Sequence, residues 1–561
     1  MRRTWGEGMA GALGTALLLH LSFPVGGPMP VWRALLAWVA LVPLLVALVR
    51  LAGDEAGRMR PLQALLTGWL CGAVWFGLHC SWVYRTMHLY GGMGSGMAAV
   101  SLVLFSLFLG VWFGVFAGVW VLGGVALGRK GSGAGAMLAV APVLWVAMEF
   151  AVARIPSFPW DELGYTQVDN GLLTRLAPWT GVMGISLLLA AANAVLAAGL
   201  LRVRSGGKWL AGWAAIAAMG VCGFWLHPSP PVATATAMLV QPNLNVATDD
   251  VWTDAQWQAH MTQFARLAAA CETPYFSGME SGVDSRPMQK DADCASRRPD
   301  LIAWPESPAP FRDHDPRFRQ AVSQLAQQMQ APVVVGDVGM DLSPGADGRM
   351  ADREYNSASV IAPSGAFVGR YDKVHLVPFG EYVPARELLF FAHQLTSQLS
   401  DLSRGMERRV FRLARTGGAA HRYGIFICYE SIFGDEVREY AALGADVLVN
   451  LSDDGWYGDT DAPWQHLNMA RMRAIENHRW LLLDTNNGLT AVVDPNGVVR
   501  QSIARNRAGV LVAHFGQDED ETWYTQHGDV VGMLCAILSV GFLLWSTRVL
   551  AGAALGRNPE R

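Results

Sequence analysis

The chain has 561 residues, of which 52% are hydrophobic and only 16% are charged. That length allows more than one domain, and the composition is too apolar for an ordinary soluble enzyme, since soluble domains carry about 25% charged residues. The net charge of -4 disfavours nucleic acid as a partner. The seven cysteines are scattered and include no CxxC pair, which excludes a disulfide scaffold and provides no zinc motif.

Apolar runs of membrane-spanning length fill the first part of the chain and recur once near its C-terminus. We predict eight spans, at residues 11–23, 31–49, 65–84, 97–127, 136–152, 182–201, 209–224 and 530–545. The first run is short enough for a signal peptide, but three prolines and no small-residue cleavage site follow it. We therefore interpret it as a retained span.

Basic residues concentrate in alternate loops between these spans. Arginines and lysines precede the first span and follow the second, fourth, sixth and eighth, whereas the other loops hold far fewer, such as Arg85, Arg154 and Arg175. The positive-inside rule then predicts cytoplasmic termini and a periplasmic location for the stretch between the seventh and eighth spans. A miscount of one span would place that stretch in the cytoplasm instead.

The stretch Ser157-Phe-Pro-Trp-Asp-Glu-Leu-Gly-Tyr165 is aromatic and lies between two predicted spans. Aromatic residues at the ends of spans are typical of the membrane interface, so we predict an interfacial belt. The alternative is the lip of an active site that opens onto the bilayer.

From about residue 233 to residue 516, short β-type runs alternate with helical segments. The predicted strands are residues 237–240, 301–304, 333–336, 357–361, 367–371, 425–427, 447–450, 480–484, 490–493 and 509–513. The predicted helices are residues 254–270, 316–328, 432–443 and 466–477. Asp494-Pro-Asn-Gly497 and Pro363-Ser-Gly365 are typical of hairpin turns. We predict an α/β domain at residues 228–528, between a membrane domain (1–227) and a C-terminal span with its tail (529–561).

Three polar residues come just after predicted strands: Glu306, Lys373 and Cys428. Because strand ends along one edge of an α/β sheet are where sites assemble, we expect these side chains to meet. The carboxylate can take the thiol proton, the ammonium can stabilise a thiolate or an oxyanion, and the thiol can attack a carbonyl. Taken singly, they also fit a helix cap, a surface charge and a small core residue.

Six motifs carry a family resemblance. They are Trp304-Pro-Glu-Ser307, Tyr371-Asp-Lys-Val-His-Leu-Val-Pro-Phe-Gly-Glu-Tyr-Val-Pro384, Cys428-Tyr-Glu-Ser431, Asn450-Leu-Ser-Asp-Asp-Gly-Trp-Tyr-Gly458, Pro463-Trp-Gln-His-Leu-Asn-Met-Ala-Arg-Met-Arg473 and Thr485-Asn-Asn-Gly488. Together with the spans, they resemble the apolipoprotein N-acyltransferases, the membrane-bound branch of the nitrilase superfamily. The resemblance covers nearly the whole chain.

The resemblance implies a polytopic α-helical membrane protein of the bacterial inner membrane with a nitrilase-like αββα extramembrane domain. It implies Glu306 as base, Lys373 as oxyanion stabiliser, Cys428 as nucleophile and Glu381 as a supporting carboxylate. Further supporting or substrate-binding candidates are Tyr429, Glu430, Trp252 and Trp456. The family transfers a fatty acyl chain from a phospholipid to the N-terminal amine of a diacylglyceryl-cysteine apolipoprotein, which implies a thioester on the nucleophile. We expect a monomer without metal or other cofactor.

Two other functions stay open at this point. The first is a membrane-tethered amidase that uses the same three residues on a small amide, although one anchor would suffice for a soluble substrate. The second is a transporter with a folded outer domain, which the scarcity of ionisable residues within the spans disfavours.

Two features of the extramembrane domain carry separate predictions. Cys271 and Cys294 lie in a polar insertion at residues 271–299, longer than expected, and either form a disulfide or stay as free thiols. The apolar cluster Leu388–Phe391 is expected to form an arm that rests on the bilayer, with an ordinary core helix as the alternative. Trp252 is either a lid residue or part of the core.

Overall fold

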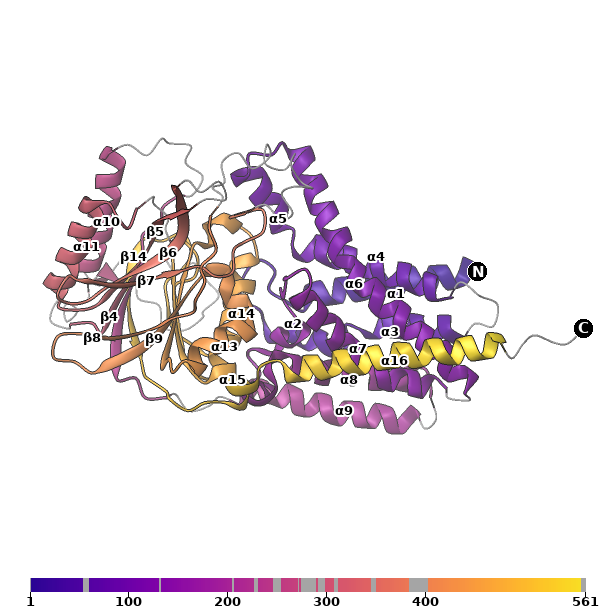
Figure 1. Cartoon of the computed structure of the whole chain (residues 1–561). Helices are drawn as coiled ribbons and strands as arrows, with labels where there is room; N and C mark the ends of the chain where they lie inside the picture. The colour runs from indigo at the N-terminus through magenta and orange to yellow at the C-terminus, as the bar shows by residue number, and fades with distance from the viewer. Residues whose placement is uncertain are drawn as a thin grey trace, which may run out of the picture. The chain divides into compact units, whose positions relative to one another are not determined.

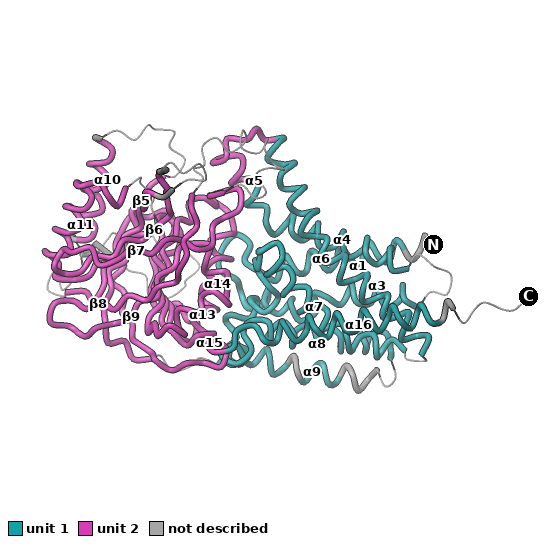
Figure 2. The backbone as a smooth tube through the Cα atoms, viewed as in Figure 1, with its two compact units in different colours: residues 1–84, 96–228, 527–561 teal, residues 85–95, 229–526 magenta. Residues whose placement is uncertain are grey.

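The computed structural model describes residues 2–53, 60–130, 133–203, 206–226, 231–245, 254–270, 272–273, 289–290, 298–306, 311–344, 350–382 and 402–555. The chain divides into two compact units (Figure 2). Met1–Tyr84, Gly96–Pro228 and His527–Arg561 form one, called here the helical unit. Arg85–Ser95 and Ser229–Gln526 form the other, called the sheet unit. The sheet unit is therefore discontinuous in sequence.

The helical unit is built from apolar helices, most of them long (Figure 1). Their bounds are α1 Arg2–Leu21, α2 Val31–Ala34, α3 Val42–Gly53, α4 Arg60–His79, α5 Trp82–Arg85, α6 Ser95–Arg129, α7 Ala134–Arg154, α8 Ala177–Leu200, α9 Gly206–Cys222 and α16 Val530–Leu555. Within the described ranges, six stretches are long and apolar enough to cross a membrane: Val31–Gly53, Arg60–His79, Ser95–Arg129, Ala134–Arg154, Leu173–Leu200 and Val530–Gly552.

The predicted number of eight spans is approximate. Six of the predicted spans coincide with these stretches. The first predicted span lies in α1, a 20-residue helix that also carries Glu7 and His20. The seventh lies in α9, which has 17 residues. At 1.5 Å per residue a helix of that length measures roughly 26 Å, slightly less than the hydrocarbon core of a bilayer.

The span predicted at residues 31–49 is not one continuous helix. It consists of α2, the short helix η1 (Leu35–Trp38) and α3, so some backbone groups have no helical partner. Asn193 of α8 supplies partners, because its Oδ1 accepts from Leu41 N at 2.9 Å and its Nδ2 donates to Ala37 O at 2.9 Å. Irregular backbone at membrane depth is tolerated only where protein groups satisfy it in this way.

Asn193→Leu is expected to lower the thermal unfolding temperature of the protein in detergent. The change leaves two buried backbone groups without these partners, at about 1–3 kcal/mol each. Ser106→Ala is the matched control, because among the described residues the Ser106 hydroxyl donates only to Leu102 O, one turn back in α6. Equal decreases in the two variants would contradict the role assigned to Asn193.

The aromatic stretch at residues 157–165 is buried inside the helical unit. Phe158 and Trp160 are 9% and 2% exposed, and their rings stack at 5.8 Å. The next residue is Asp161, whose Oδ2 lies within hydrogen-bond distance of His79 Nε2, at 2.7 Å. Both side chains are buried. The prediction of an interfacial belt is wrong here, because belt side chains face the membrane surface and these pack inward.

Two six-stranded sheets form the core of the sheet unit (Figure 1). The first has the order β14-β1-β4-β5-β6-β7, with bounds Gly509–Phe515, Ala235–Gln241, Leu301–Trp304, Val333–Pro344, Met350–Ile361 and Phe367–Asp372. The second has the order β13-β12-β11-β10-β9-β8, with bounds Val499–Ser502, Ala491–Val493, Trp480–Thr485, Val447–Ser452, Ala420–Ile427 and Val410–Ala414. Strands β2 (Glu272–Thr273) and β3 (Gln289–Lys290) pair with each other.

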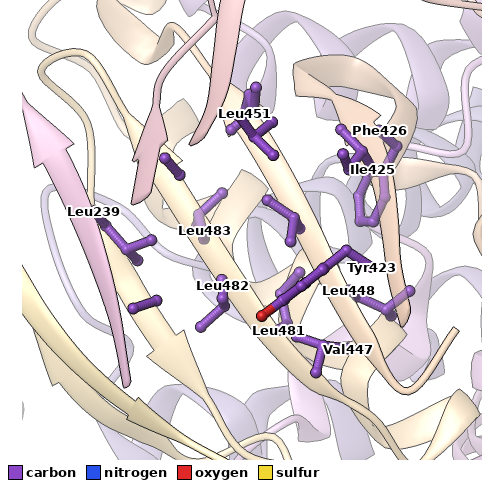
Figure 3. Close-up of a cluster of buried hydrophobic side chains, with 14 of the residues drawn as sticks. Leu239, Tyr423, Ile425, Phe426, Val447, Leu448, Leu451, Leu481, Leu482 and Leu483 are labelled. Atoms are coloured by element: carbon purple, nitrogen blue, oxygen red, sulfur yellow. The ribbon is translucent and has the colours of Figure 1, made fainter. Parts of the chain in front are cut away.

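The sheets pack face to face, and two pairs of helices cover their outer faces. The helices are α10 (Asp254–Ala270) and α11 (Pro316–Met329) on one side, and α13 (Gly434–Ala442) and α14 (Ala462–Asn477) on the other. In β1, Leu239 belongs to the core between the sheets, whereas Met238 and Val240 belong to the core beneath α10 and α11. Successive strand side chains point to opposite faces, so one strand serves both cores. Figure 3 shows the core between the sheets, with Leu239 of one sheet and Leu482 of the other. The predicted αββα fold is confirmed.

Both predicted hairpin turns are present. Gly497 and Gly365 have φ angles of +78° and +84°, in the region that glycine enters without a steric penalty. The Asp494 carboxylate closes the first turn by accepting from Asn496 N and Val498 N. The predicted disulfide between Cys271 and Cys294, the Leu388–Phe391 arm and Trp252 all lie outside the described residues.

Candidate active site

The strand order brings Glu306, Lys373 and Cys428 together. Glu306 follows β4 and Lys373 follows β7; these strands run in the same direction, because β5 is parallel to β4 and β6 is antiparallel to both β5 and β7. Glu306 and Lys373 therefore lie at the same end of the strands of the first sheet. Cys428 follows β9 in the second sheet, near enough to Glu306 and Lys373 for both of their charges to act on the ionisation of its thiol.

The Lys373 ammonium lies between two carboxylates. Its Nζ donates to Glu306 Oε1 at 3.1 Å and to Glu381 Oε1 at 3.0 Å, and the side chain is 1% exposed. Asn356 of β6 donates its Nδ2 to the same two oxygens, at 2.7 and 2.6 Å. Burial opposes the charge on Lys373, but the two carboxylates outweigh it and raise its pKa well above the usual value. Lys373 is thus a fixed cation at neutral pH.

Glu306 is held from both sheets. Its Oε2 accepts from Asp453 N at 2.8 Å, in the loop that follows β10 of the second sheet. Its Oε1 accepts from Asn356 and Lys373 of the first sheet. Three donors therefore fix the orientation of this carboxylate beside Cys428.

Cys428 opens the short helix η7 (Cys428–Ile432) directly after β9. Its φ angle of +49° lies in the left-handed region, where residues other than glycine are strained by about 1–3 kcal/mol and where functional residues are often found. Burial, followed by the negative charge of Glu306, raises the pKa of the Cys428 thiol well above its usual value, against the opposing charge of Lys373. The resting group is therefore a protonated thiol that needs a base before it can attack.

The pH dependence of alkylation tests this protonation state. The rate at which iodoacetamide alkylates Cys428 is expected to keep rising beyond about pH 9, because only the thiolate reacts. Glu306→Gln removes the negative charge that raises the thiol pKa, so its curve should move to lower pH. Mass spectrometry of the Cys428 peptide measures both rates. A plateau below about pH 7.5 in the unmodified protein would indicate a preformed thiolate instead.

Glu430 is a buried acceptor that ties two loops together. Its Oε1 accepts from Val374 N at 2.7 Å and its Oε2 from Ile427 N at 2.7 Å. The Tyr371 hydroxyl donates to both oxygens, at 2.7 and 2.9 Å. Glu430 thereby joins the chain after β7 to the turn after β9, which are the segments that carry Lys373 and Cys428.

Tyr429 is also buried, and its ring packs edge-on against Phe433 with centroids 5.3 Å apart. The distance between the Tyr429 and His375 ring centroids is 6.0 Å. The aromatic packing on one side of the Cys428 turn therefore includes Tyr429.

Trp456 is 40% exposed and belongs to the loop after β10. The segment Arg85–Ser95, which comes from between two apolar helices, contacts this loop within the sheet unit. Arg85 Nη1 donates to Asp459 O at 2.9 Å, and Thr86 Oγ1 donates to Trp456 O at 3.0 Å. The Tyr90 ring meets the Trp456 ring edge-on at 5.5 Å. The segment therefore holds the loop whose Asp453 N–H binds Glu306.

Sequence reasoning assigned no individual role to Asn356 or to His466 of α14. Asn356 directly precedes a predicted strand, where a polar residue is ordinary, so nothing local in the sequence marks it. His466 stands in one of the motifs that carry the family resemblance, but nothing local separates it from an ordinary core histidine.

A buried thiol beside a fixed carboxylate and a fixed ammonium is suited to covalent acyl chemistry.

Comparison with known proteins gives the family of the chain. A model of the apolipoprotein N-acyltransferase N-terminal domain matches residues 15–195, and a carbon-nitrogen hydrolase model matches residues 239–523. The chain is 31% identical over 530 residues to the apolipoprotein N-acyltransferase of Geobacter metallireducens, covering 93% of this chain and 92% of that protein. It is 31% identical over 567 residues to the Bordetella bronchiseptica apolipoprotein N-acyltransferase, covering 95% and 94%.

Among solved structures, the chain is similar to Saccharomyces cerevisiae Nit3, a member of the nitrilase superfamily. That similarity has a TM-score of 0.35 and 18% identity, and it covers 51% of this chain and 93% of that one. The relatives that match over nearly their whole length assign the family: the chain is a membrane protein that belongs to the apolipoprotein N-acyltransferases, and its candidate active site lies in its carbon-nitrogen hydrolase domain.

Proposed function

We propose that this protein transfers a fatty acyl chain from a membrane phospholipid to the N-terminal amine of a diacylglyceryl-cysteine apolipoprotein. The observation that carries the proposal is the buried Cys428 thiol with Glu306 and Lys373 fixed beside it. The relatives are named for N-acyl transfer to apolipoproteins, and the six spanning stretches suit a lipid donor.

In the first half-reaction, Cys428 attacks the ester carbonyl of the phospholipid. Glu306 takes the thiol proton, and Lys373 stabilises the negative charge that develops on the carbonyl oxygen. The new S–C bond replaces the ester C–O bond. Glu306 then returns the proton to the departing lysophospholipid, which leaves a thioester on Cys428. Glu381 holds Lys373 in place, and Asn356 holds Glu306.

In the second half-reaction, the neutral amine of the apolipoprotein attacks the thioester. The N–C bond forms, the S–C bond breaks, and Glu306 carries the amine proton to the sulfur. A dry site beside the bilayer would let transfer outrun hydrolysis, because water is the competing nucleophile.

Incubation of the purified protein with an acyl-labelled phospholipid tests the function. We expect one labelled acyl chain per protein, cleavable by neutral hydroxylamine, and lysophospholipid released before any acceptor is added. A lipopeptide with a free N-terminal amine should then discharge the label and become acylated. Hydrolysis of small amides without loading would favour a tethered amidase, and the absence of either chemistry would favour a transporter.

We also propose that residues 228–528 form a periplasmic catalytic domain in an inner-membrane protein that works as a monomer. The motivation is the alternation of basic loops along the sequence. A reporter fused after Arg561 should read cytoplasmic, and one inserted after Pro344 should read periplasmic. The opposite pair of readings would overturn the orientation, and light scattering in detergent would test the monomer.

A further inference from the structure

His466 is a fully buried histidine that the proposed reaction does not use. It lies on α14, and its side chain is 0% exposed. Its Nδ1 is 3.0 Å from Asp454 Oδ1, while its Nε2 is 2.6 Å from Ser431 Oγ and 3.2 Å from Cys428 O. Buried polar atoms are expensive unless they are partnered, and both ring nitrogens here have partners.

The contact with Cys428 O bears on the conformation of the Cys428 backbone. The residue holds a φ angle of +49°, which a non-glycine side chain keeps only where the surroundings impose it. The Cys428 carbonyl faces His466 Nε2, and Asn450 Nδ2 donates to the same oxygen at 3.4 Å. Since a trans peptide is planar, fixing this C=O also fixes the direction of the Tyr429 N–H, opposite to His466.

The contact with Asp454 connects the same histidine to Glu306. Asp454 follows Asp453, whose backbone N–H donates to Glu306 Oε2 at 2.8 Å. Asp454 Oδ1 also accepts from Ser452 Oγ at 2.9 Å, which fixes the carboxylate at the end of β10. A chain of contacts therefore runs from Glu306 through the loop after β10 to His466 and on to the Cys428 carbonyl.

The charge state of His466 is consistent with two donated hydrogen bonds. Burial opposes a charge on the ring, but the Asp454 carboxylate outweighs it and raises the His466 pKa. In the protonated ring, Nδ1–H donates to Asp454 and Nε2–H points to the Cys428 carbonyl and the Ser431 hydroxyl.

We propose that His466, held by Asp454, is a positioning residue for acyl transfer. It fixes the peptide group between Cys428 and Tyr429 and thereby keeps the Cys428 thiol aligned with Glu306. The proposal rests on the proposed function, because it takes Cys428 as the nucleophile. It assigns His466 no contact with substrate.

The test is single-turnover acyl loading of the full-length protein from a labelled phospholipid, at several lipid concentrations. His466→Ala is expected to lower the loading rate constant by roughly 10²-fold, since a misplacement of about 1 Å is enough for such a loss. The lipid concentration at half-maximal rate should change by less than about 2-fold, because lipid binding does not involve the ring. His466→Gln keeps a side-chain N–H of similar reach and should recover about 10-fold of the loss.

His421→Ala is the matched control. His421 is buried on β9, the strand that leads to Cys428, and its ring packs on Tyr423 and Phe515 at 5.9 and 5.5 Å. It should lower the thermal unfolding temperature as His466→Ala does, yet load at nearly the unmodified rate. If His466→Ala does not fold, Asp454→Asn takes its place and should slow loading in the same way. Normal loading in the His466 variants, or an equal loss in His421→Ala, would overturn the proposal.

A second readout separates this proposal from the function on which it rests. Alkylation of Cys428 by iodoacetamide needs no lipid, and its rate should differ from that of the unmodified protein in His466→Ala but not in His421→Ala. If the unmodified protein never loads acyl chains, the proposed function fails, whereas the alkylation rates still decide whether His466 positions the thiol. Equal alkylation rates in both variants would reject the positioning role, whatever the substrate.

Discussion

Cys428→Ser is expected to abolish acyl loading while phospholipid still binds. Serine keeps the size of the side chain, but its hydroxyl ionises far less readily than a thiol. Burial already raises the pKa of the Cys428 thiol, and Glu306 and Lys373 are arranged to ionise that thiol. They cannot ionise the much less acidic hydroxyl of a serine in the same place. The loading rate constant should fall by roughly 10³-fold or more, as for other deleted nucleophiles.

Labelled phospholipid, hydroxylamine treatment and mass spectrometry of the intact protein measure this loss. Cys535→Ser is the matched control, because Cys535 is a buried cysteine of the helical unit and should tolerate the change without loss of loading. Lysophospholipid that appears only when both donor and acceptor are present, or normal loading by Cys428→Ser, would show that no thioester forms on this residue.

Lys373→Met is expected to have two separable effects. The first is on stability, because the change leaves Glu306 and Glu381 buried without their shared cation, at about 3–5 kcal/mol. The second is on the reaction, because the developing oxyanion loses its ammonium, which should slow loading by about 10²–10³-fold. Thermal unfolding in detergent and single-turnover loading measure the two separately.

The double variant Lys373→Met, Glu381→Gln distinguishes these effects. It removes one of the two unpaired carboxylates, so most of the lost stability should return. Asn356 Nδ2 still donates to Glu306, which keeps that carboxylate in place. Loading should nevertheless stay as slow as in the single variant. Loading that recovers together with stability would mean that Lys373 supports the fold and not the reaction.

The three residues at the centre of the site could be predicted because each follows a strand that is visible in the local sequence. Leu301–Trp304 and the end of β9 are continuous apolar runs, which is the pattern of strands buried on both faces. Sites in α/β folds assemble at strand ends, so these residues could be predicted without knowing the order in which the strands pair. The roles of these residues stay predictions until the variants are measured.

Other parts of the molecule left no local signal. Strands β8 and β13 were not predicted, and they are the two edge strands of the second sheet. Edge strands often carry polar residues, which discourage their exposed side from pairing with another chain. The sequence Val499-Arg-Gln-Ser502 therefore does not predict a strand. Asn356 meets Glu306 only through tertiary pairing, fifty residues away along the chain. The break near Ala37 is invisible because its polar partner, Asn193, comes from a different helix.

The discontinuous sheet unit has a consequence for how the protein is made. Thr86 and Arg85 contact the loop after β10 across sequence separations of 370 and 374 residues. At about 5–20 residues per second, a ribosome needs roughly 20–75 seconds to make that intervening chain. The segment Arg85–Ser95 is thus synthesised long before the loop after β10 with which it makes contact. A nascent chain that ends between residues 428 and 460 has Glu306, Lys373 and Cys428 but lacks the complete loop that secures Glu306. The reactive thiol is therefore present in the growing chain well before its surroundings are finished, and its raised pKa keeps it inert only once those surroundings have folded.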